Sequence, residues 1–208
     1  RIRTRRRQLR RPRSVFPPSI WRAHVVISLV GMPGSGKSTV GRHVSRHLGL
    51  AFVDTDHRIE QRIGCSIRAY FELHGEAAFR DVEAEVIDEV TRDSETGVIA
   101  TGGGAVLRDS NRAALHERTQ VFYLRSTPED LVRRLRHDTH RPLLQGSADP
   151  LKRLRALFQE RDPLYRRCAH FVIETGRPSV HTLVSMVLMQ IELAGLVPPA
   201  QQAPPPRP

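Results

Sequence analysis

Short apolar runs alternate along the chain with longer segments in which apolar residues recur at a helical period. The runs are rich in β-branched residues and have the length of buried strands; they cover 24–30, 51–55, 97–101, 120–124 and 170–175. The longer segments predict helices over 38–48, 57–93 with breaks at Gly64 and Gly75, 110–118, 128–137, 150–168 and 179–194. Strands that alternate with helices predict an α/β domain in which a parallel sheet lies between helices on both faces.

The last predicted helix has a clear packing face. Its longest run without a charged residue or histidine, "TLVSMVLMQI" at 182–191, spans ten residues, whereas a helix needs about 20 to cross a bilayer. We therefore expect a soluble protein in which this helix packs on the core and holds no ligand. The predicted packing face consists of Val180, Leu183, Val184, Val187, Leu188 and Ile191.

The basic charge of the chain is concentrated at one end. The 208 residues carry a formal net charge of +11, and residues 1–22 contain nine arginines and no acid, so residues 23–208 keep only 11 − 9 = +2. This composition predicts a disordered extension over 1–23, which lacks the apolar run of a secretory signal. We favour an extension without an assigned role over an arm that binds nucleic acid or a membrane.

The Pro-rich C-terminal end and the two cysteines indicate the extent of the domain and its cellular compartment. The Pro-rich end, "GLVPPAQQAPPPRP", predicts a second disordered tail over 196–208 and leaves one domain over 24–195. Cys65 and Cys168 lie far apart and form no metal-binding spacing, so we expect reduced thiols in a cytoplasmic protein. We also expect a monomer that acts on a small molecule and requires neither nucleic acid nor a membrane.

A phosphate-binding motif lies between the first predicted strand and the helix that follows it. The residues "GMPGSGKST" (31–39) match G-x-x-x-x-G-K-[ST] in the strand–loop–helix context that this motif requires. Its glycines let backbone N–H groups surround a phosphate chain, and the helix N-terminus adds partial positive charge. Lys37 is placed to reach the β- and γ-phosphates, and the Ser38 hydroxyl to bind Mg²⁺. The motif predicts a nucleoside triphosphate site.

Polar groups also follow the neighbouring strands, at the carboxyl ends where parallel sheets bind ligands. Asp54 and Asp56 end the second strand two residues apart, so we expect both carboxylates on one side of it. The glycines at 102–104 can offer backbone N–H groups where side chains would obstruct a ligand. Arg80 adds positive charge, and we expect an arginine of "ERDPLYRR" (160–167) to face the same site. A hydroxylated carboxylic acid fits this set of groups as the phosphate acceptor.

An arginine-containing segment precedes the helix over 150–168. Residues 138–149, "DTHRPLLQGSAD", predict a mobile lid. A lid that closes over phosphoryl transfer excludes water and brings positive charge to the migrating group. We expect Arg141 to supply that charge, whereas Arg133 and Arg136 are expected to lie on a solvated helix face.

Together these motifs resemble those of the shikimate kinase family over residues 24–195. The resemblance implies a P-loop kinase fold like that of the nucleoside monophosphate kinases, with a five-stranded parallel sheet in the order 2-3-1-4-5. It also implies transfer of the γ-phosphate of ATP to the 3-hydroxyl of shikimate, in aromatic amino-acid biosynthesis. The motifs that carry it, in the order and spacing of the family, are the P-loop, "DTD" (54–56), "FRDVE" (79–83), "GGGAV" (102–106), "RPLL" (141–144) and "RDPLY" (161–165).

The resemblance implies roles for individual residues. Asp54 would hold Mg²⁺ through water, together with Ser38, and Asp56 would orient the attacking hydroxyl or take its proton. Lys37, Asp56 and Arg141 would be catalytic. The substrate site would consist of Asp56, Arg80, Gly102, Gly103, Gly104 and Arg161. The ATP site would consist of Gly34, Ser35, Gly36, Lys37, Ser38, Thr39, Arg134, Arg141, Arg177 and Pro178.

Two alternatives remain. A gluconate kinase of the same fold would share the P-loop and the lid but need not combine "DTD", "FRxxE" and "GGG". A non-catalytic regulator that senses a shikimate-like ligand would not need the complete set of Lys37, Ser38, Asp54 and Arg141. The sequence therefore favours a shikimate kinase-like enzyme over both.

Overall fold

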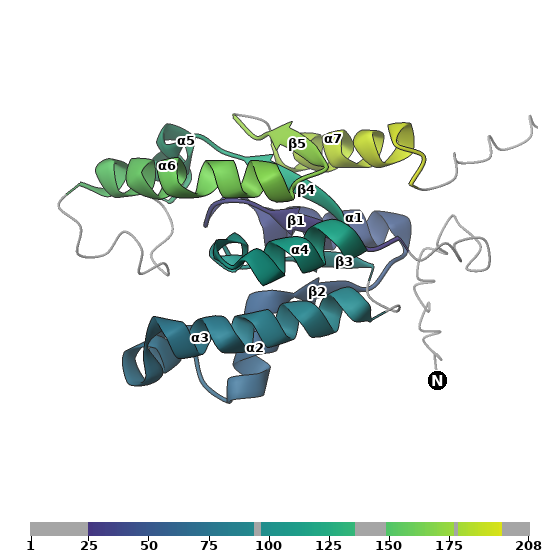
Figure 1. Ribbon diagram of the computed structural model, residues 1–208. Helices are drawn as coiled ribbons and strands as arrows, with labels where there is room; N and C mark the ends of the chain where they lie inside the picture. The colour runs from purple at the N-terminus through teal and green to yellow at the C-terminus, as the bar shows by residue number, and fades with distance from the viewer. Residues whose placement is uncertain (1–24, 94–96, 136–148, 177–178, 197–208) are drawn as a thin grey trace, which may run out of the picture.

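The computed structural model describes residues 25–93, 97–135, 149–176 and 179–196. The predicted extension over 1–23 lies outside the described residues. So do the predicted tail over 196–208, apart from Leu196, and the predicted lid over 138–149, apart from Asp149. In the described part, a central sheet separates two layers of helices (Figure 1).

The sheet consists of five parallel strands in the order 2-3-1-4-5, as the resemblance implies. They are β1 (Ile27–Val30), β2 (Phe52–Asp54), β3 (Val98–Ala100), β4 (Gln120–Arg125) and β5 (Phe171–Glu174). The central strand β1 pairs with β3 and β4, so that Ile27 lies opposite Val98 and Gln120. All five predicted strands are confirmed, with small shifts at their ends.

The helices occupy the positions that the apolar periodicity predicts. The described residues form α1 (Lys37–Leu48), α2 (Thr55–Ile63), α3 (Ile67–Arg92), the 3₁₀ turn η1 (Ala105–Leu107), α4 (Asp109–Arg118), α5 (Pro128–Leu135), α6 (Pro150–Cys168) and α7 (Val180–Leu193). Gly64 ends α2, and Gly75 interrupts α3 with a positive φ of 80°, so both predicted breaks are confirmed. No helix of the described residues is both long and apolar enough to cross a membrane.

The chain leaves the second strand earlier than the sequence analysis expects. β2 ends at Asp54, whose Oδ1 accepts hydrogen bonds from the N–H groups of Asp56 (3.1 Å) and His57 (3.4 Å). An acid in this position satisfies N–H groups that have no partner within the helix, so α2 begins here. Asp56 therefore lies in the first turn of a helix, and the expectation that both carboxylates project from one side of a strand is wrong.

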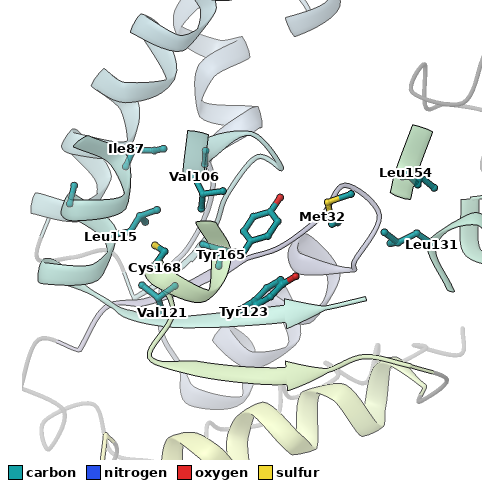
Figure 2. Close-up of a cluster of buried hydrophobic side chains, with 13 residues drawn as sticks. Met32, Ile87, Val106, Leu115, Val121, Tyr123, Leu131, Leu154, Tyr165 and Cys168 are labelled. Carbon is teal, nitrogen blue, oxygen red and sulfur yellow. The ribbon is translucent and has the colours of Figure 1, made fainter. Parts of the chain in front are cut away.

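Both faces of the sheet are buried against helices. Successive residues of a strand point to opposite faces, so Ile27 and Leu29 pack with residues of α1 and α7, whereas Val30 packs with residues of α4 and α6. Figure 2 shows the second of these clusters, in which Tyr123 of β4 and Tyr165 of α6 lie close together. The core thereby fixes α1 and α6 relative to the carboxyl ends of the strands.

The packing face of α7 is largely as predicted. Leu183, Val187 and Ile191 are buried in the cluster shared with α1 and the sheet. Val180, which the sequence analysis places on the same face, is 43% exposed. It occupies the first position of the helix, so its side chain lies at the margin of the packed face.

We predict that Ile191→Ala lowers the free energy of unfolding by about 2–5 kcal/mol, because Ile191 is buried and its truncation leaves a cavity. Met189 on the same helix is 57% exposed, so Met189→Ala should change that free energy by less than about 0.5 kcal/mol. Urea unfolding followed by circular dichroism measures both variants. Equal losses in the two would contradict this orientation of α7.

Candidate active site

An open cleft of ≈ 1070 Å³ lies where the chain leaves β1, β2 and β3 at their carboxyl ends. Its walls come from the P-loop, the first turn of α2, the helix α3, the segment after β3 and the helix α6. Most of the residues that the sequence analysis assigns to the site line this one cleft. They are Gly34, Gly36, Lys37, Ser38, Thr39, Asp56, Arg80, Gly102, Gly103, Gly104 and Arg161.

The P-loop presents the N-terminus of α1 to the cleft. Gly36, the residue before the helix, has a φ of 93°, in the left-handed region that glycine enters without strain. Among the described residues no side chain caps the helix, and the N–H groups of a helix N-terminus favour an anionic ligand. The buried Lys37 ammonium donates hydrogen bonds to the carbonyls of Gly31 (2.8 Å) and Met32 (3.0 Å). The loop therefore combines N–H donors and a positive charge, as a phosphate chain requires.

Several predicted ATP-site and metal-site residues do not line the cleft. Ser35 is fully buried, and its N–H donates to a carbonyl of the P-loop itself (3.1 Å). Asp54 caps α2. Arg134 joins α5 to the segment after β5 by donating to the Gly176 carbonyl at 3.1 Å, so its contact with adenine stays a prediction. The predicted residues outside the described part of the chain are Arg141, Arg177 and Pro178.

The three glycines after β3 are the place where the parts of the site meet. A Cβ atom on Gly102 would lie 2.5 Å from Asp56 Oδ1, and one on Gly103 would lie 2.6 Å from the Pro33 ring of the P-loop. A Cβ atom on Gly104 would overlap the Arg80 guanidinium. At Gly103 the obstacle is a rigid ring, so glycine is required there for close approach, whereas at Gly102 and Gly104 a larger residue would displace the Asp56 or Arg80 side chain. This argues against a merely flexible connection.

Arg80 is held in the cleft wall by two acids and two aromatic rings of α3. Its Nη1 donates to Glu83 Oε2 at 2.6 Å, and its Nη2 donates to Glu76 Oε1 at 3.1 Å. The guanidinium carbon lies 5.2 Å from the centre of the Phe79 ring and 5.9 Å from that of Phe71, within the range of cation–π attraction. These contacts therefore hold the Arg80 guanidinium in position before any ligand binds.

Glu83 is the site residue that the sequence analysis missed. Its side chain is 1% exposed, and it pairs with Arg80 one helical turn before it. Burial raises the pKa of Glu83, whereas Arg80 and Arg161 favour its ionised form. An acid three residues after Arg80 in "FRDVE" was the signal that could have identified it.

Arg161 approaches the same glycines from α6. Its Nη1 donates to the Gly103 carbonyl at 3.3 Å, and its Nε is buried without a hydrogen-bond partner among the described residues. A buried donor without an acceptor costs about 1–3 kcal/mol, and an anionic ligand in the cleft would satisfy it. By contrast, Arg166 of the same helix is half exposed and pairs with Asp162. Arg161 is therefore the arginine of 160–167 that faces the cleft.

Asp56 lies between the P-loop and the arginines. Surrounding protein displaces water from its carboxyl group, and with a smaller effect of the neighbouring Asp54 this raises the pKa of Asp56 to about 6. Asp56 remains exposed to the cleft, so its carboxyl group is only partly desolvated. Lys37 opposes the shift, because its positive charge favours the carboxylate. Asp56 is therefore ionised near neutral pH but close to the range in which it takes up a proton.

His57 belongs to the capped start of α2, and the two cysteines are free thiols, as predicted. His57 lies in the first turn of α2, where its N–H donates to Asp54, and its ring contacts Gln61. Cys65 is exposed and Cys168 is buried, and both are free thiols. None of the three lines the cleft.

Comparison with known proteins agrees with this geometry. The family model described as shikimate kinase matches residues 33–192. The chain belongs to the shikimate kinase family. The shikimate kinase of Burkholderia pseudomallei (strain 1710b) is 58% identical over 180 residues, which are 86% of this chain and 97% of that protein. ATP is the phosphate donor of this family.

Solved structures place the family in its fold class. The shikimate kinase from Acinetobacter baumannii in complex with shikimate superposes on this shikimate kinase family member with a TM-score of 0.77 and 42% identity, covering 83% of this chain and 96% of that one. A gluconokinase from Sinorhizobium meliloti 1021 has a TM-score of 0.53 and 16% identity, covering 82% of this chain and 93% of that one. That second likeness shows the fold alone and gives the gluconate kinase alternative no further support.

In this member of the shikimate kinase family, we predict that Asp56→Asn stabilises the ligand-free protein increasingly as the pH rises. The folded-state pKa, about 6, lies above the ordinary value of 3.8, so the folded state favours the neutral carboxyl group. The stability that wild-type Asp56 gives to the folded state is therefore fully present below the ordinary pKa, where the group is neutral, and is lost as the pH rises through about 6. Asparagine stays neutral throughout and avoids the loss.

Urea unfolding of both proteins at several pH values between about 4 and 8 measures this difference. The advantage of Asp56→Asn should grow through the interval and level off above pH about 7. A difference between the two proteins that is independent of pH would contradict the assigned environment of Asp56.

Proposed function

We propose that this chain is an enzyme that transfers the γ-phosphate of ATP to the 3-hydroxyl of shikimate, giving shikimate 3-phosphate. The observation that carries the proposal is the convergence of the P-loop, Asp56, Arg80 and Arg161 on the glycines at 102–104. This arrangement offers a carboxylate site and a hydroxyl acceptor beside a phosphate site. Membership of the family and the shikimate complex of the A. baumannii relative support the same substrate.

The phosphate chain of ATP would lie across the P-loop. The N–H groups of the first turn of α1 would donate to phosphate oxygens, and the Lys37 ammonium would neutralise charge on the β- and γ-phosphates. Arg141 would add positive charge on the transferring group from the segment before α6. Arg134, Arg177 and Pro178 would line the adenine.

The residues around the P-loop offer suitable oxygen ligands for Mg²⁺. This ion keeps several water molecules and needs few protein oxygens when phosphates bind it as well. Ser38 lines the cleft, and the two capping bonds of Asp54 engage only its Oδ1, which leaves Oδ2 for a metal-bound water. Among the described residues, no cluster of three or more acids, histidines or cysteines could hold a metal without such help. When bound, Mg²⁺ would neutralise charge that develops on the phosphates.

The acceptor would be held by its carboxylate and activated at its hydroxyl. Arg80 and Arg161 would bind the carboxylate, with the backbone of Gly103 and Gly104 beside them. Asp56 would accept a hydrogen bond from the 3-hydroxyl, and the proton would pass to it as the oxygen bonds to the γ-phosphorus and the bond to ADP breaks. The ionised state of Asp56 near pH 7 suits this role.

We further propose that the catalytic unit is a cytoplasmic monomer spanning about 24–195, which requires neither nucleic acid nor a membrane. The exposed free thiol of Cys65 fits a reducing compartment.

The proposal is tested by ADP release with MgATP and a panel of acceptors: shikimate, quinate, gluconate, a nucleoside monophosphate and water alone. We predict rapid turnover with shikimate only. Arg161→Ala should raise KM for shikimate by about 10- to 100-fold, because charged hydrogen bonds to the carboxylate are lost. Asp56→Asn should lower kcat by about 10²- to 10⁴-fold.

Arg167→Ala is the matched control, because Arg167 lies on the exposed side of the same helix and does not line the cleft. Its constants should stay within about twofold of those of the wild type. Turnover with gluconate or a nucleotide in place of shikimate would overturn the substrate assignment. ATP binding without ADP release on any acceptor would overturn the proposed activity.

A further inference from the structure

Two residues of α6 bind the same backbone carbonyl of the glycine segment. Arg161 and Tyr165 are four residues apart and therefore share one face of the helix. The Tyr165 hydroxyl donates to the Gly103 carbonyl at 2.5 Å, and Arg161 Nη1 donates to the same oxygen at 3.3 Å. The tyrosine thus makes the shorter of the two bonds.

Tyr165 is itself held rigidly by the core. Its ring is fully buried and stacks on that of Tyr123, with ring centres 4.9 Å apart (Figure 2). The Tyr123 hydroxyl points to a different partner, Asp162 Oδ1, at 2.8 Å. Burial raises the pKa of Tyr165, so its hydroxyl stays protonated and remains a donor. Tyr165 therefore reaches Gly103 from a position that the packing of α6 on β4 defines.

Because the Tyr165 hydroxyl already donates a hydrogen bond to the Gly103 carbonyl, Arg161 does not have to satisfy that carbonyl alone. The Gly103 carbonyl is partly buried and therefore favours a hydrogen-bond donor from the protein, and Arg161 is the other donor among the described residues that reaches it. If the hydroxyl were absent, the guanidinium would be drawn to Gly103 as its sole donor. With the hydroxyl present, the Arg161 contact is long, and its buried Nε is left without a partner among the described residues.

We propose that Tyr165 is a positioning residue for the carboxylate of the acceptor: its hydroxyl fixes the Gly103 carbonyl, so that Arg161 and the adjoining glycine backbone keep their orientation toward the cleft. Tyr165 does not contact the substrate in this account and acts through Arg161 and Gly103. The inference rests on the proposed function, because it assumes an acceptor with a carboxylate at this place.

The decisive variant is Tyr165→Phe, which removes the hydroxyl and keeps the ring in its stack. We predict that KM for shikimate, and the dissociation constant of shikimate measured by calorimetry, both rise about tenfold, as expected for the loss of one buried hydrogen bond. The value of kcat and the KM for ATP should change less than about threefold. A role confined to stability would lower Tm and leave the affinity for shikimate unchanged.

Tyr123→Phe is the matched control, because it removes a buried hydroxyl from the same ring stack without touching Gly103. It should lower Tm but leave KM for shikimate within about twofold. In an Arg161→Ala background, Tyr165→Phe should raise KM much less than tenfold, because the residue through which it acts is gone.

An unchanged KM in Tyr165→Phe, an equal rise in Tyr123→Phe, or a full tenfold rise in the Arg161→Ala background would each overturn the inference. Failure of the wild-type protein to phosphorylate shikimate would instead overturn the proposed function, so the two failures are distinguishable.

Discussion

The site depends on one short stretch of backbone that carries no side chains. At 102–104 the chain leaves β3, and three separate parts of the fold come within contact distance of it: Asp56 of α2, the P-loop and Arg80 of α3. A Cβ atom on Gly103 would collide with the Pro33 ring of the P-loop, and one on Gly102 or Gly104 would displace the side chain of Asp56 or Arg80. Phosphoryl transfer depends on positioning of donor and acceptor more than on covalent chemistry by the protein. The close approach of Asp56, the P-loop and Arg80 to the glycines at 102–104 is therefore the constraint on which the rest of the site depends.

The buried Glu83–Arg80 pair sets the charge of the acceptor side. A buried ion pair offsets the cost of its desolvation only with good geometry and further hydrogen bonds, and here Arg80 also binds Glu76 and two aromatic rings. Glu83 and Glu76 both pair with Arg80, whereas Arg161 forms no ion pair with an acid among the described residues. The positive charge of Arg161 is therefore the one that a carboxylate of the acceptor would match. Asp56 lies on the P-loop side of the cleft. Its pKa is raised because the surrounding protein displaces water that would stabilise the negative charge of the carboxylate.

Local patterns predicted the sheet, the helices and the P-loop, because each depends on periodicity or on a contiguous motif. The strand order came from the family resemblance and not from periodicity. The prediction that Asp54 and Asp56 project from one side of a strand was wrong, because capping competes with strand extension and an acid before a helix favours the cap. For Glu83, the spacing of three residues from Arg80 was a signal that went unused. The burial of Glu83 and the proposed role of Tyr165 could not be predicted from the sequence. Those depend on burial and on the way α6 packs against the segment after β3, which no local pattern records.

The central claim is that the cleft recognises the carboxylate of its acceptor through Arg80, Arg161 and the glycine backbone. Calorimetric titration of the wild-type protein with shikimate and with its methyl ester, which has the same ring and hydroxyls but no negative charge, tests this directly. We expect the ester to bind at least about tenfold more weakly, and we expect Arg161→Ala to remove most of this discrimination. Equal affinity of the wild-type protein for the acid and the ester would contradict it.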